Sequence, residues 1–85
     1  MDEEISEEEV EKARALLRTI RDPDASHAER RSATYGLAKL GKPGGDALAE
    51  VARDTAISVL LRQHADWAGQ ENHQARLKRM TRGMR

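Results

Sequence analysis

Apolar residues in the first quarter of the chain recur every three or four positions, the spacing that places them on one face of an α-helix. They are Val10, Ala13, Leu16, Leu17 and Ile20. Ser6 precedes this stripe and Glu9 follows three residues later, a capping-box pattern that predicts a helix start. The residue before Pro23 disfavours the α conformation. The pattern therefore predicts a helix over residues 7–21.

A second apolar stripe follows another capping box, formed by Ser26 and Glu29. Its members are Ala33, Leu37 and Leu40. The next segment, residues 41–45, reads Gly-Lys-Pro-Gly-Gly, a composition that commonly ends a helix. We therefore expect a second helix over residues 27–40 and a short connector of the kind that joins antiparallel helices.

The third apolar segment opens at Asp46 and permits two interpretations. Either one helix continues to Trp67, or the helix breaks near Asp54 and restarts. Neither Gly nor Pro lies at the junction, so one long helix is favoured. Residues 57–61 are apolar on more than one side, which indicates a place in the core or in an interface. Gly69 is expected to close this helix.

Residues 70–85 carry a sparser stripe with basic residues between its members. The stripe consists of His73, Leu77, Met80 and Met84. This spacing fits either a helix that forms on a partner or a frayed tail. Together the patterns predict an all-α fold, a small antiparallel bundle of three to four helices. They divide the chain into a helical domain, residues 1–69, and a basic C-terminal helix or tail, residues 70–85.

Four short motifs follow one another between residues 21 and 54. They are Asp22-Pro23-Asp24, Arg30-Arg31-Ser32-Ala33, Leu40-Gly41-Lys42-Pro43, and Ala47-Leu48 leading to Asp54. In this order they resemble a HEAT-like helical repeat of the short, phycobilin-lyase type. The segment from Leu17 to Asp22 is also similar to the segment from Leu48 to Asp54, as a repeat requires. The resemblance covers one full unit, whereas solenoids need roughly three. It implies a single HEAT-like helical hairpin with flanking helices, used as a protein-binding scaffold rather than an enzyme.

The composition fits a small folded domain. The 85 residues include 15 acidic and 15 basic residues and no cysteine, so a disulfide framework is excluded. The N-terminus is acidic, unlike a signal peptide, and no apolar stretch approaches the ~20 residues that cross a bilayer. We therefore expect a cytoplasmic protein with no membrane partner. Eleven Arg against four Lys, with abundant Ala, indicate a GC-rich bacterial or phage genome.

The charges are concentrated at opposite ends of the chain. Residues 1–11 carry seven acids and no base, and residues 72–85 carry five bases and no acid. Such ends bind partners or each other. The five bases are Arg76, Lys78, Arg79, Arg82 and Arg85. They could contact the phosphates of DNA or RNA, although this segment has no aromatic residue for base stacking. Nucleic-acid binding through these residues is the alternative function.

The sequence does not indicate catalysis. His27, His64 and His73 are not spaced as a metal-ligand set, and residues 41–45 lack the spacing of a phosphate-binding loop. The serines are explained as helix caps or lie in helical patterns without a partner base. We therefore expect a non-enzymatic protein with no metal and no cofactor.

The leading hypothesis is a small adaptor or regulator that acts through protein–protein contact, with a homodimer as one form of that contact. Its binding surface is expected to combine the charged ends with Ile57, Leu60, Leu61 and Trp67. For Trp67, burial in the core is favoured over exposure in an interface, because tryptophan is largely buried on average.

Overall fold

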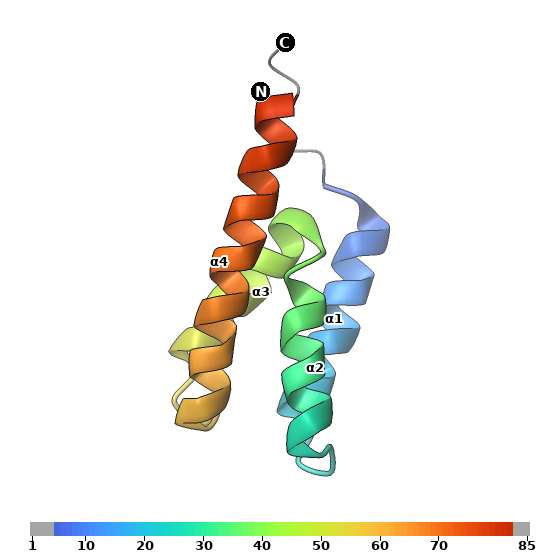
Figure 1. Ribbon diagram of the computed structural model, residues 1–85. Coiled ribbons are helices and arrows are strands. Elements are labelled where there is room, and N and C mark those ends of the chain that lie inside the picture. The colour runs from blue at the N-terminus through green and yellow to red at the C-terminus, as the bar shows by residue number, and fades with distance from the viewer. Residues whose placement is uncertain (1–4, 83–85) are drawn as a thin grey trace.

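The computed structural model describes residues 5–82, which form four helices and no strand (Figure 1). The helices are α1 (Glu7–Arg21), α2 (His27–Leu37), α3 (Gly41–Arg53) and α4 (Val59–Arg82). They pack against one another, so the predicted all-α bundle is confirmed. Among these helices none combines the length and the apolar character that a membrane crossing requires.

The four helices form two hairpins that pack side by side. α1 pairs with α2 and α3 pairs with α4, and between the hairpins α1 contacts α3 while α2 contacts α4. In the view of Figure 1, α2 and α4 lie in front of α1 and α3, and α4 rises beyond the other helices at its C-terminal end. The largest fully buried apolar side chains are Ile20, Leu37, Leu48, Val51 and Leu61. Six alanines complete the core and let the helices approach closely: Ala13, Ala33, Ala38, Ala47, Ala65 and Ala68.

The first helix has the bounds that the sequence predicts, but its cap differs. Ser6 makes no side-chain capping bond, and its backbone carbonyl accepts from the Val10 amide at 3.1 Å. This helix end is exposed, so water can satisfy its remaining amides. The predicted capping box at the start of α2 is present, because Ser26 Oγ accepts from the Glu29 amide and Glu29 Oε1 accepts from the Ser26 amide.

The prediction of a connector at residues 41–45 is wrong. α2 ends at Leu37, three residues early, and the Gly-Lys-Pro-Gly-Gly segment forms the first turn of α3. Proline is tolerated there because the first amides of a helix have no intrahelical partner. Gly44 is required by packing, since a Cβ at this position would collide with the Leu37 carbonyl oxygen. The glycines thus allow α3 to begin against the end of α2.

The favoured single helix from Asp46 to Trp67 is also wrong. α3 ends at Arg53 and α4 begins at Val59. Asp54 Oδ1 accepts from the Ala56 amide at 3.0 Å, and Ser58 Oγ accepts from the Leu61 amide at 3.3 Å. The helix is interrupted here by side-chain capping from Asp and Ser, rather than by Gly or Pro.

Gly69 does not end a helix, contrary to the prediction. α4 continues through it to Arg82, so the described part of the basic segment is helical and continuous with the core helix. The predicted boundary between residues 69 and 70 therefore falls inside one helix. Met84 and Arg85 lie outside the described residues.

The α1–α2 and α3–α4 loops have the same construction. Each begins with Arg-Asp at a helix end and reaches a capping serine four residues after the aspartate, and the two copies are 32 residues apart. Asp22 Oδ1 accepts from the Asp24 amide at 2.9 Å, just as Asp54 accepts from the Ala56 amide. Ser26 and Ser58 then cap α2 and α4. The chain therefore contains two structurally similar helical hairpins.

Candidate protein-binding surface

A cluster of aromatic rings lies where α2 and α4 meet. Tyr35 on α2 and His64 on α4 share a hydrogen bond of 3.0 Å between Tyr35 Oη and His64 Nδ1. The His64 ring stands edge to face with Trp67, with ring centroids 5.2 Å apart at 87°. His27 completes the group, 6.5 Å from the His64 ring. We call His27, Tyr35, His64 and Trp67 the aromatic cluster.

The aromatic cluster is open to solvent at its outer edge. Trp67 is 46% exposed, although it is the largest apolar side chain of the protein. Leu60 is 49% exposed and lies seven residues earlier on α4, which places it on the same helix face. Because indole is amphipathic and rigid, a half-exposed tryptophan supported by neighbouring rings is typical of the anchor of a protein interface.

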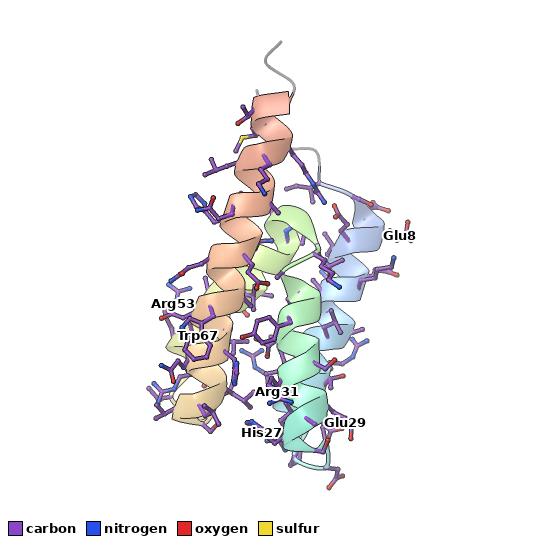
Figure 2. All side chains as sticks on the ribbon, viewed as in Figure 1. Glu8, His27, Glu29, Arg31, Arg53 and Trp67 are labelled. Atoms are coloured by element: carbon purple, nitrogen blue, oxygen red, sulfur yellow. The ribbon has the colours of Figure 1, made fainter. Side chains whose placement is uncertain are left out.

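A cation borders the aromatic cluster. Figure 2 shows Arg31 and His27 on α2 and Trp67 on α4 on the same side of the molecule. Arg31 is exposed and has no ion-pair partner among residues 5–82. Aromatic and arginine side chains are the residues most enriched at binding hot spots. The surface therefore combines an apolar anchor with an exposed guanidinium.

The structure separates the four residues expected at the partner surface. Leu60 and Trp67 are exposed and share one face of α4. Ile57 and Leu61 are core residues, only 8% and 2% exposed, because the α3–α4 loop turns them towards the first hairpin. They support the surface from beneath and are not available for direct contact. The expectation that Trp67 is buried is wrong, since small Ala residues fill the adjacent core positions on α4.

The C-terminal bases whose side chains the structure describes lie on more than one side of α4. Arg76 is half-buried beside α3, where a Cβ on Gly45 would lie 3.1 Å from Arg76 Nη1. Lys78 is exposed and, being two positions further along the helix, projects from a different side.

Arg79, near the end of α4, lies close to an acidic group. Arg79 is exposed and its guanidinium shares the surroundings of Gly41 with the Glu9 carboxylate. Arg82 ends α4, and no side-chain placement is described for it or for Arg85. Cations near the C-terminus of a helix are also stabilised by its dipole.

The residue that fixes α4 against the rest of the protein is Asn72, which the sequence patterns did not single out. Its side chain is 1% exposed, and Nδ2 donates to the Ala38 carbonyl at 3.1 Å and to the Gly41 carbonyl at 2.8 Å. Ala38 follows the end of α2, and Gly41 is the first residue of α3. A polar residue in a segment interpreted as a tail carries no signal of such burial before the tertiary structure is known.

Metal ions in proteins are held by groups of ligand side chains. Between residues 5 and 82, no group of three or more potential ligand side chains is placed to hold a metal ion. The fold and the surface thus define a small two-hairpin helical protein with one exposed aromatic cluster. No protein-family model, curated protein or solved structure matches the chain.

Proposed function

We propose that this protein is a small, non-enzymatic adaptor or regulator that binds a protein partner through the aromatic cluster. The observation that carries the proposal is Trp67, half-exposed and held edge to face by His64. Leaving this ring in water forgoes roughly 1.5–3 kcal/mol of burial free energy, which a partner can recover. Arg31 adds a charged contact at the same place. We further propose that the protein acts in the cytoplasm, in line with its cysteine-free composition.

The two similar hairpins support a relationship to HEAT-like repeats as part of this proposal. Two units of α1–α2 and α3–α4, offset by 32 residues, are joined by loops of one construction. Repeat proteins of this kind use one layer of helices as a binding surface. In the present protein the layer formed by α2 and α4 carries the aromatic cluster.

Site-specific photo-crosslinking in the host cell tests the proposed surface. A photoreactive amino acid replaces Leu60 beside the aromatic cluster in one variant, and exposed Arg18 on α1 in the matched control. The proposal predicts a defined protein adduct from position 60 that is absent from position 18. Equal adduct patterns from both positions, or none from position 60, would refute it.

The nucleic-acid alternative is separated by a binding titration. Fluorescence anisotropy of a random DNA duplex is followed at low salt with the full chain and with a chain truncated before Arg76. The proposal predicts that DNA binding does not depend on the residues removed by the truncation. Binding that disappears on truncation and weakens steeply with salt would favour phosphate contacts instead.

A further inference from the structure

The two hairpins are joined by an ion pair between residues of their repeated Arg-Asp motifs. Arg21 closes α1 of the first hairpin, and its Nη2 lies 3.5 Å from Asp54 Oδ2 in the loop of the second. The same nitrogen lies 3.8 Å from Glu50 Oε2. The arginine that ends the first helix of one hairpin thus forms an ion pair with the aspartate in the loop of the next hairpin.

Each hairpin also carries one residue of this type that has no such partner within the described residues: Arg53 in the second hairpin and Asp22 in the first. Arg53 occupies the position in the second hairpin that Arg21 has in the first, and its Nε donates only to the Ala49 carbonyl of its own helix. Asp22 occupies the position of Asp54, and its carboxylate accepts only from the Asp24 amide. Neither forms an ion pair within the described part of the chain. Asp22 and Arg53 are therefore opposite in charge, whereas the position equivalent to Glu50 is occupied by Arg18.

The second hairpin, which carries Arg53, also has a surface groove. A groove of about 550 Å³ runs between α3 and α4, and its lining includes Gly45, Ala49, Ala52, Gly69 and Gln70. These residues lie 32 positions after Ala13, Leu17, Ile20, Leu37 and Ala38.

In the first hairpin, residues at the equivalent positions face the second hairpin. Leu17 lines one cavity together with Pro43 and Ala47, and Ile20 lines another together with Ile57. The α3–α4 groove is therefore the equivalent receiving surface of the second hairpin, left open within this chain. It is bordered by Arg53, whose side chain lies at the outer edge of the molecule in Figure 2.

We propose that a second copy of this chain stacks head to tail on the α3–α4 groove, with its Asp22 beside Arg53 of the first copy. The exposed residues Ala28 and Ser32 lie four apart on one face of α2, and such small side chains let a helix approach closely. The contact joins two different faces, so each added copy brings a free face on which another copy can stack. Assembly therefore grows with concentration.

Sedimentation velocity of the purified full chain at low salt tests this arrangement. The wild-type protein is expected to show an average mass that rises with concentration beyond that of a dimer. Arg53→Glu and Asp22→Arg each place like charges together and are expected to raise the assembling concentration about tenfold. A 1:1 mixture of the two variants restores opposite charges at every contact, and so does the double variant. Both are expected to assemble as the wild-type protein does.

Asp24→Arg makes the same charge change in the same loop, outside the repeated contact, and is the matched control. Circular dichroism and thermal unfolding establish that each variant is folded before its mass is compared. A wild-type chain that stays monomeric, a mass that stops at a dimer, or single variants that assemble normally would each overturn the proposal. The purified chain contains no other protein, so this result is independent of the partner proposed for the aromatic cluster.

Discussion

Replacing Asn72 with alanine removes the buried side chain that ties α4 to the end of α2 and the start of α3. The substitution eliminates two hydrogen bonds, of 2.8 and 3.1 Å, and deprives two backbone carbonyls of a buried donor. Each net hydrogen bond contributes about 1 kcal/mol, and a buried carbonyl left without a partner costs about 1–3 kcal/mol. We therefore expect the free energy of unfolding to fall by about 2–4 kcal/mol.

This loss is large for a protein of 85 residues, whose total stability is expected to lie at about 4–13 kcal/mol. It corresponds to a decrease in Tm of about 10–25 °C. Urea unfolding followed by circular dichroism measures it, with Gln74→Ala as the control because Gln74 is an exposed amide on the same helix. A loss below about 0.5 kcal/mol, equal to that of the control, would refute the role of Asn72.

Asn72→Asp provides a second test with nearly unchanged volume. An ionised carboxylate cannot donate to the Ala38 and Gly41 carbonyls, whereas the protonated form can donate once. The folded protein therefore raises the pKa of the introduced carboxyl above its unfolded value of about 3.9. The folded state then binds the proton more tightly, so the variant loses stability as pH rises above that value. The stability deficit relative to wild type is expected to be smaller at pH 4 than at pH 7, and a constant deficit would contradict this reasoning.

Two further pairs of substitutions test the corrected helix boundaries by urea unfolding. Gly44→Ala is expected to cost more than about 2 kcal/mol, because its Cβ would collide with the Leu37 carbonyl oxygen. Gly69→Ala, whose new Cβ would meet nothing within 4 Å beyond its chain neighbours and its own helix backbone, is expected to stabilise α4 by up to about 1 kcal/mol. Similar effects of both would argue against the close approach of α3 to α2. Ser58→Ala removes a cap and should cost about 1 kcal/mol, whereas Ser6→Ala should cost little since Ser6 makes no side-chain cap. Equal costs would place the start of α4 elsewhere.

Local patterns predicted the elements whose signals lie within one or two helical turns. The bounds of α1 and the capping box of Ser26 follow from the spacing of apolar residues and from side-chain capping. The break before α4 had a signal of the same kind, because Asp54 and Ser58 repeat the spacing of Asp22 and Ser26. The absence of Gly or Pro favours one long helix, whereas this repeated spacing indicates a break, and the capping bonds of Asp54 and Ser58 show that the break is present.

The remaining features depend on contacts between segments distant in the sequence. In the sequence, Gly44 belongs to a segment typical of a helix end. Its role in packing becomes evident only from its approach to the Leu37 carbonyl. Asn72 reads as part of a polar tail until α4 lies beside the carbonyls that it binds. The exposure of Trp67 likewise follows from the direction of one helix face, which the average behaviour of tryptophan does not reveal. Of the candidate surface, the sequence could identify Leu60 and Trp67 but not their association with Tyr35 and His64.

The central claim is that the exposed tryptophan of the aromatic cluster anchors a protein partner. The most direct measurement is the affinity of the partner crosslinked from position 60 for the wild-type protein, Trp67→Ala and Leu77→Ala. Leu77 is 41% exposed on the same helix and lies outside the cluster, so it controls for loss of exposed apolar area. Truncation of an interface anchor costs about 2 kcal/mol or more, so Trp67→Ala is expected to weaken binding at least about thirtyfold while Leu77→Ala leaves it nearly unchanged. Equal affinities for the wild-type protein and Trp67→Ala would contradict the account.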